Sequence, residues 1–402
     1  MIDTAGLRAH FPALDRGVAY FDGPGGSQVP DAVADAIART LTAGVANRGR
    51  ITAAERVADD TVLAARSAMA DLLGADPAGI VFGRSMTALT FDFSRALAAG
   101  WAPGDEIVVT RLDHDANIRP WLIAAQRAGV RVRWAEFDPA TAELPVTAVT
   151  GLLTDRTRLV AVTAASNLLG TRPDVAAITH AAHAVGAITY VDAVHAAAHV
   201  PIDVAELGAD LLVCSPYKFL GPHCGVLAGR VEELERLWPD KLLPSTDEVP
   251  ERFELGTLPY ELLAGTTAAV DFLASLAGQT HRVAGDRRQQ LLAAMRRVDA
   301  HEEGLRRRIE AGLADLPGVT VHSRAARRTP TLLLTFAGRD PQAAYRFLAE
   351  RGINAPAGSF YAIEASRFLG LGDGGGLRVG LAPYVDDSDV DRLLVGLAEF
   401  MR

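Results

Sequence analysis

Lys218 stands almost directly beyond an apolar run of the chain, and that position suggests chemistry. The run 209–215 has the composition of a buried strand, and a glycine-bounded turn, 219–225, follows the lysine. A lysine held in this way can form a Schiff base with a carbonyl compound and can move a proton. The alternative is an ordinary surface lysine in a turn.

Other polar side chains follow neighbouring apolar runs that we also predict to be strands. They are His114 after 105–110, Asn167 after the run that begins at 157, Asp192 and His195 at the end of 187–195, and Ser215 and Tyr217 beside Lys218. In an open α/β sheet, ligands bind beyond the carboxyl ends of the strands. We therefore expect these side chains to gather at one edge of the sheet.

A helix start follows another predicted strand, 79–83. Ser85, Met86 and Thr87 open this helix, where free backbone N–H groups and hydroxyls suit an anion such as phosphate. Taken alone, Ser85 or Thr87 is better explained as a helix N-cap.

The set as a whole matches the needs of pyridoxal phosphate. A lysine forms the Schiff base, a carboxylate keeps the pyridine nitrogen protonated, an imidazole covers the ring, and a helix N-terminus holds the phosphate. Lys218, Asp192, His114 and the 85–87 segment supply these groups. The sequence therefore predicts pyridoxal 5'-phosphate as the cofactor.

The elements that position these residues alternate between strand-like and helix-like patterns. Buried apolar runs separated by helices predict an α/β fold with a mostly parallel central sheet covered on both faces. From about residue 280 a charged helical stretch leads into a smaller α+β region, and Asp386 to Asp389 favour the start of a last amphipathic helix. We predict a large domain over 1–280, with a short N-terminal segment, and a small C-terminal domain over 281–402.

The sequence resembles the class V, fold type I aminotransferases that depend on pyridoxal phosphate, and among them the cysteine-desulfurase-like branch. The resemblance covers nearly the whole chain. It is carried by YFDGPGGSQVP (20–30), LDHDANIRPW (112–121), ASNLLG (165–170), YVDAVH (190–195), ADLLVCSPYKFLGPHCGVLAGR (209–230) and RFELGTLP (252–259). It implies the fold and the cofactor more specifically than the reaction, because one fold hosts many chemistries.

The resemblance also implies a role for each matched residue. Lys218 corresponds to the Schiff-base lysine, Asp192 to the partner of the pyridine nitrogen, and His114 to the ring-stacking histidine. Asn167 and His195 correspond to residues that contact the cofactor on the side of its ring oxygen. Three further residues correspond to contacts with the cofactor's phosphate, namely Thr87, Ser215 and Tyr217. Arg378 corresponds to the arginine that binds the substrate α-carboxylate, and Asn167 is also expected at the substrate. Thr257 corresponds to a phosphate contact from a partner subunit, which implies a homodimer.

Desulfurases of this branch carry a mobile cysteine in the small domain, and here the sequence departs from them. The corresponding stretch is 354–362, with Tyr361 in the place of the cysteine. The two cysteines of the chain, Cys214 and Cys224, lie in a predicted strand and in the turn after Lys218. We expect an enzyme that acts on a small amino acid without persulfide transfer. β-Elimination of the C–S lyase type, transamination and epimerisation remain open, as does a protein that binds the cofactor without turnover.

Composition limits the other classes of function. The formal net charge of -9 argues against a nucleic-acid partner. No apolar run reaches about 18 residues, so we expect neither a membrane span nor a secretory signal. Two cysteines without a CxxC pattern favour a reducing, cytoplasmic location and no structural metal site. The glycine-rich stretches 22–26 and 372–376 do not form a dinucleotide-binding motif.

Overall fold

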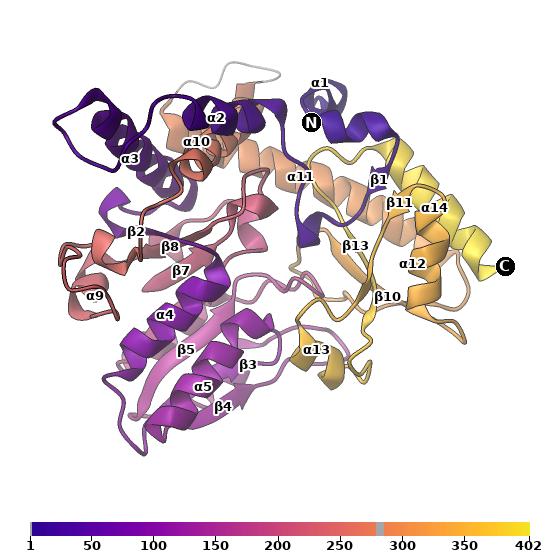
Figure 1. The fold of residues 1–402 in the computed structure, drawn as a ribbon. Helices are drawn as coiled ribbons and strands as arrows, with labels where there is room; N and C mark the ends of the chain where they lie inside the picture. The colour runs from indigo at the N-terminus through magenta and orange to yellow at the C-terminus, as the bar shows by residue number, and fades with distance from the viewer. Residues whose placement is uncertain (1, 279–284) are drawn as a thin grey trace.

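The computed structural model describes residues 2–278 and 285–402, and its larger part is built around a seven-stranded sheet (Figure 1). In spatial order the strands are β2 (Ile80–Gly83), β8 (Gly225–Gly229), β7 (Leu211–Cys214), β6 (Ile188–Asp192), β5 (Thr157–Thr163), β3 (Glu106–Thr110) and β4 (Arg131–Ala135). Within this sheet β8 pairs antiparallel with both β2 and β7, and the other neighbours pair in parallel. The predicted α/β fold with a mostly parallel sheet is confirmed.

Helices cover both faces of this sheet. Successive strand residues point to opposite sides, and the apolar ones on each side need a partner to bury them. Val108 and Leu212 pack into one apolar cluster with side chains of α3 (Ala53–Leu73), α7 (Val175–Ala184) and α10 (Tyr260–Ser275). Ile107 and Val213 pack into a second cluster with α4 (Met86–Ala98) and α5 (Arg119–Ala128). The core residues of both clusters are buried, so the strands of this sheet are packed on both faces. Shorter or peripheral helices complete this part, namely α2 (Asp31–Leu41), α6 (Val146–Thr150), α8 (Val204–Leu207) and α9 (Val231–Arg236).

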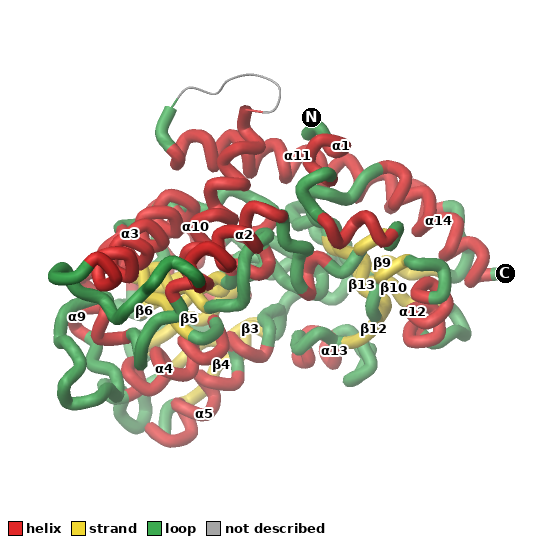
Figure 2. The backbone as a smooth tube through the Cα atoms, turned by 45° about the horizontal axis from the view of Figure 1, so that its top comes forward, coloured by secondary structure: helices red, strands yellow, loops and turns green. Residues whose placement is uncertain are grey.

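The C-terminal part is an antiparallel sheet packed on helices, and Figure 2 shows it lying beside the larger sheet. Its strands, in spatial order, are β12 (Ala357–Gly358), β13 (Gly376–Gly380), β10 (Thr331–Phe336) and β9 (Val319–Val321). Its helices are α11 (Arg287–Ala314), α12 (Pro341–Ala349), α13 (Ile363–Phe368) and α14 (Asp387–Met401). A capping box formed by Asp386 and Asp389 starts α14, as the sequence predicts. The predicted domain boundary at 280/281 lies outside the described residues.

The N-terminal segment reaches across to the C-terminal part. After α1 (Thr4–Arg8), β1 (Ala19–Tyr20) pairs in parallel with β11 (Ile353–Asn354). The Arg8 guanidinium lies 2.7 Å from a carboxylate oxygen of Asp389 at the start of α14. In Figure 1 the indigo N-terminus accordingly lies next to the yellow C-terminal helix. This docking brings the loop that follows β1 to the space between the two sheets.

Across residues 2–278 and 285–402, no helix is both long enough and apolar enough to cross a lipid bilayer.

Candidate active site

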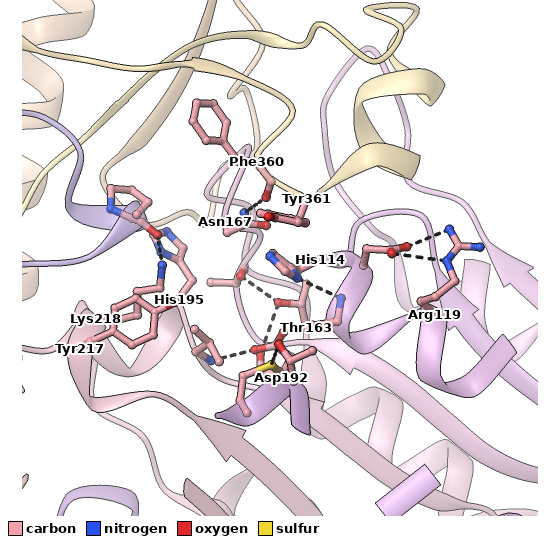
Figure 3. Close-up of a pocket in the computed structure, with 18 of the residues that line it drawn as sticks. His114, Arg119, Thr163, Asn167, Asp192, His195, Tyr217, Lys218, Phe360 and Tyr361 are labelled. Carbon is pink, nitrogen blue, oxygen red and sulfur yellow. Dashed lines mark hydrogen bonds and ion pairs between the residues drawn. The ribbon is translucent and has the colours of Figure 1, made fainter. Parts of the chain in front are cut away.

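A cavity of about 630 Å³ opens where the strands of the large sheet end (Figure 3). Most residues that the sequence predicts for the site line it together: Met86, Thr87, His114, Asn167, Asp192, His195, Tyr217, Lys218 and Arg378. They come from five strand ends and from β13 of the C-terminal sheet. The cavity therefore lies between the two parts of the chain.

Lys218 ends a 3₁₀ turn, Pro216–Lys218, directly after β7. Its Nζ donates to the carbonyl oxygen of Pro24 at 2.5 Å and lies 4.6 Å from the centre of the Tyr217 ring. Burial, and then the positive charge of Arg378, lower the pKa of the Lys218 ammonium to about 7, against the opposing effect of Asp192. A substantial fraction of this amine is consequently neutral and nucleophilic near neutral pH.

Asp192 is the last residue of β6 and is almost completely buried. One of its carboxylate oxygens accepts a hydrogen bond from the Val194 N–H at 2.9 Å. Burial raises the pKa of this carboxyl to about 6, although that hydrogen bond and the charge of Lys218 oppose the rise. Above this pH the carboxylate is a buried anion that can hold a positively charged group facing it.

His114 lies on the loop after β3, with its Nδ1 accepting from the Ala116 N–H at 3.0 Å. Burial, and then the charge of Lys218, lower the pKa of its imidazole to about 4, so the ring is neutral. Its ring stacks against that of Tyr361, with centroids 5.4 Å apart and planes inclined by 30°. A neutral flat ring at this place suits stacking on a heteroaromatic ligand.

Asp113 fixes the loop that carries His114. Its fully buried carboxyl bonds the Thr110 hydroxyl and accepts from the Asn117 amide at 2.7 Å. Asn117 in turn accepts from the Trp121 indole N–H at 3.0 Å. Burial raises the pKa of Asp113 to about 8, so this carboxyl is protonated and adds no negative charge beside His114 at neutral pH. Asp113 is not among the residues predicted for the site from the sequence.

Arg378, in β13, is buried at the opposite wall of the cavity. Its Nη1 donates to the carbonyl oxygen of Asn167 at 3.0 Å, and its guanidinium carbon lies 3.7 Å from the centre of the Phe360 ring. Among the described residues, neither the Arg378 Nε nor the Asn167 Oδ1 has a hydrogen-bond partner, although both atoms are buried. Buried polar atoms without partners at a cavity wall indicate a place where a ligand completes the hydrogen bonds.

His195 lies at the back of the cavity, where the C-terminal part meets the large sheet. Its Nε2 is 2.9 Å from the Thr329 hydroxyl and 3.0 Å from the Thr331 hydroxyl. Its ring also meets the edge of His199, whose Nδ1 lies 2.8 Å from a carboxylate oxygen of Glu302 in α11. Burial, followed by the charge of neighbouring cations, lowers the pKa of His195, so this ring acts as a neutral hydrogen-bonding group.

Only some of the residues predicted to bind the cofactor's phosphate line the cavity. The Ser85 hydroxyl accepts from the Ala88 N–H at 3.1 Å as the N-cap of α4, and only Met86 and Thr87 of this segment line the cavity. Ser215 is buried next to the cavity and is not part of its lining. Thr257 lies in an exposed loop outside the cavity of its own chain.

Several lining residues were not predicted for the site from the sequence, including Pro24, Gly25, Phe360 and the Asp115–Arg119 ion pair. In the sequence, the glycine-rich stretch 22–26 carries part of the family resemblance and is not predicted to line the site. Its actual role is close packing, since a Cβ on Gly26, whose φ is +155°, would lie 3.3 Å from the Tyr217 ring.

The number of lysines is a further indication in the sequence that Lys218 belongs to the site. The chain contains only two lysines, Lys218 and Lys241. A lysine retained in so arginine-rich a chain points to a role that arginine cannot fill.

The side chains that line the cavity fit pyridoxal phosphate. Within the described ranges, no group of three or more His, Cys, Asp or Glu side chains is arranged to hold a metal ion. The amine of Lys218, the anionic Asp192 and the neutral ring of His114 instead supply the three groups that a pyridine aldehyde needs. The unpartnered Arg378 Nε–H can donate to an anionic substrate group beside the cofactor, and the unpartnered Asn167 Oδ1 can accept from a donor group of the ligand.

Comparisons with known proteins agree with this reading of the cavity. The family model "Aminotransferase class-V" matches residues 19–393. An uncharacterised protein of Mycobacterium tuberculosis, MT3887, is 34% identical over 399 residues, which cover 98% of this chain and 98% of the relative. The cysteine desulfurase CsdA of Escherichia coli is 31% identical over 411 residues, covering 98% of this chain and 96% of the relative.

Solved structures give the same result. The crystal structure of Escherichia coli CsdA in its S-sulfonic acid form superimposes with a TM-score of 0.86 at 30% identity, covering 99% of this chain and 98% of the other. An apo cysteine desulfurase from Thermococcus onnurineus superimposes with a TM-score of 0.90 at 24% identity, covering 100% and 98%. The second likeness shows the fold alone.

Proposed function

This chain belongs to the aminotransferase class-V family, and from that membership we propose that it is an enzyme that removes the α-proton of a small amino acid. The observation that carries the proposal is the placement of Lys218, Asp192 and Arg378 around one cavity. Pyridoxal phosphate is the cofactor of this family, and it supplies an electron-withdrawing ring next to the substrate's α-carbon when bound.

The residues of the chain divide the work among them. Lys218 would hold the cofactor, and its amine, whose pKa is about 7 when free, would accept and return the substrate's α-proton. Asp192 would keep the pyridine nitrogen positively charged, and His114 would cover the face of the ring. Arg378 binds the substrate α-carboxylate through N–H groups that are otherwise incompletely paired.

The reaction that follows proton removal is proposed to be β-elimination or transamination without persulfide transfer. The support is the chemistry of the segment 354–362, where a tyrosine side chain, Tyr361, faces His114 at the rim of the cavity. Neither of the two cysteines is placed to carry sulfur outward, since Cys214 and Cys224 are both buried. Incubation with L- and D-amino acids, with pyruvate, sulfide and ammonia measured together, tests the proposal. Inversion of the α-carbon alone would make the enzyme an epimerase, and inertness toward all would make it a cofactor-binding protein.

Cys224→Ser is expected to leave the main activity within a few-fold of the unchanged enzyme. The Cys224 thiol is buried against the Thr266 hydroxyl at 3.5 Å, and burial raises its pKa to about 11, so little nucleophilic thiolate is present at neutral pH. Intact-protein mass spectrometry after treatment with L-cysteine should show no stable sulfur adduct. An adduct mapped to Cys224, lost together with activity in the serine variant, would restore desulfuration as the function.

Capture of pyridoxal phosphate by the apoprotein is expected to speed up about tenfold per pH unit below pH 7 and to level off above it. The neutral amine is the reactive form, and burial lowers the pKa of Lys218 to about 7, so its neutral fraction rises through this range. Stopped-flow absorbance of the cofactor measures the rate. A rate that continues to climb toward pH 10 would show an ordinary, solvated lysine at the site.

A homodimer is the expected active unit, with Thr257 of each subunit completing the phosphate site of the other. The exposed position of Thr257, away from its own cavity, supports this arrangement. Analytical ultracentrifugation should give twice the chain mass of 42.5 kDa, and Thr257→Val should weaken cofactor affinity about fivefold to tenfold through one lost hydrogen bond. A fully active monomer would contradict the proposal.

A further inference from the structure

The turn at Phe360 and Tyr361 has a backbone that most residues avoid. Phe360 has φ = +52° and Tyr361 has φ = +60°, so two consecutive non-glycine residues lie in the left-handed region. This region is unfavourable for bulky side chains, because Cβ approaches the neighbouring carbonyl oxygen. Such strain persists only where the surroundings hold it, and it is concentrated at functional sites.

Two hydrogen bonds from the large sheet hold this turn over the cavity. The Asn167 Nδ2 donates to the carbonyl oxygen of Phe360 at 2.9 Å, and the Asp115 N–H donates to that of Tyr361 at 2.8 Å. Both donors follow strand ends that also carry site residues. In Figure 3 the Phe360 carbonyl meets Asn167 above the cavity, and the phenyl ring points away from that bond.

The ring that this backbone displays lies on the guanidinium of Arg378. The guanidinium carbon is 3.7 Å from the centre of the Phe360 ring, which places the cation over the ring face. A hydrogen bond from Nη1 to the Asn167 carbonyl oxygen, 3.0 Å long, fixes one edge of the same guanidinium. The Nε remains without a partner. Phe360 thus covers one face of the Arg378 guanidinium and restricts the orientation of its plane, while the Nε–H has no hydrogen-bond partner.

We propose that Phe360 is a positioning residue that orients Arg378 for the substrate's α-carboxylate, and that the strained turn is kept for this purpose. The inference deepens the proposed function and rests on the carboxylate-binding role given there to Arg378. A planar guanidinium recognises a carboxylate well only when its plane is fixed, because the two hydrogen bonds of the pair are directional.

The experiment compares two probes on the enzyme loaded with pyridoxal phosphate: L-alanine, which has a carboxylate, and L-alaninamide, which does not. The absorbance change of the cofactor gives both dissociation constants, and their ratio measures carboxylate recognition. General damage to the site alters both constants and cancels in the ratio. Phe360→Leu keeps an apolar side chain and should reduce the preference for L-alanine about fivefold to thirtyfold, whereas Phe360→Tyr keeps the ring and should preserve it.

The chain offers a matched control in Phe347 and Arg351, whose guanidinium carbon is 3.5 Å from the centre of the Phe347 ring, outside the cavity. Phe347→Leu removes a similar contact and should leave the ratio unchanged. If Arg378→Gln leaves the ratio intact, or the unchanged enzyme shows no preference or no response, the role of Arg378 fails and the inference fails with it. Two other outcomes would overturn the role of Phe360 alone, provided that Arg378→Gln abolishes the preference. In one, Phe360→Leu leaves the preference for L-alanine unreduced. In the other, Phe360→Tyr reduces this preference.

Discussion

Lys218→Ala is expected to lower turnover by at least about a thousandfold and to abolish covalent attachment of the cofactor. The substitution removes both the amine that holds the cofactor and the base that moves the α-proton, and proton transfer by a positioned side chain alone contributes about a hundredfold to ten-thousandfold. Arginine is not a substitute, because its guanidinium remains protonated near neutral pH. The measurements are the visible absorbance of the purified variant and its activity on the best substrate found for the unchanged enzyme.

The small number of lysines makes this test unusually clear. Lys241, the only other lysine in the sequence, pairs with Asp247 at 2.8 Å and lies outside the cavity. Lys241→Ala should therefore keep both colour and activity. Borohydride reduction of the unchanged enzyme, followed by peptide mapping, should place the cofactor on Lys218. A label on Lys241, or full activity in Lys218→Ala, would remove Lys218 from the mechanism.

Asp192→Asn should retain most of the cofactor binding but lose about a hundredfold or more of the turnover. The amide has nearly the same shape and keeps an oxygen that can accept from the Val194 N–H. It carries no negative charge, and a neutral group cannot keep the pyridine nitrogen protonated in a buried site. Cofactor affinity by absorbance titration and kcat on the same preparation separate the two effects.

A suitable comparison for this variant is Asp113→Asn, at the other buried carboxyl beside the site. Burial raises the pKa of Asp113 to about 8, so its carboxyl is already uncharged at neutral pH and its loss removes hydrogen bonds rather than charge. The asparagine variant at 113 should consequently lose far less activity than that at 192. Equal losses at both positions would show that Asp192 acts by shaping the site and not by its charge.

The sequence alone was sufficient to predict which side chains of the large sheet lie together in the cavity. Lys218, Asp192 and His114 each follow an apolar run closely, and parallel strands necessarily bring their carboxyl ends to one edge. Strand periodicity is a local property, so it can be recognised in a few residues. The fold and the cofactor follow from that pattern and from the matched motifs, and the family membership agrees with both.

The other wall of the cavity was decided by the tertiary structure. Arg378 donates a hydrogen bond to Asn167, which is 211 residues away in the sequence. Lys218 donates one to Pro24, which is 194 residues away. Contacts of this kind depend on how the C-terminal sheet and the N-terminal loop dock on the large sheet, and no local pattern encodes that docking. The left-handed backbone at Phe360 and Tyr361 is equally hidden from the sequence, because intrinsic preference disfavours it there and the hydrogen bonds that hold it come from Asn167 and Asp115, which are distant in the sequence.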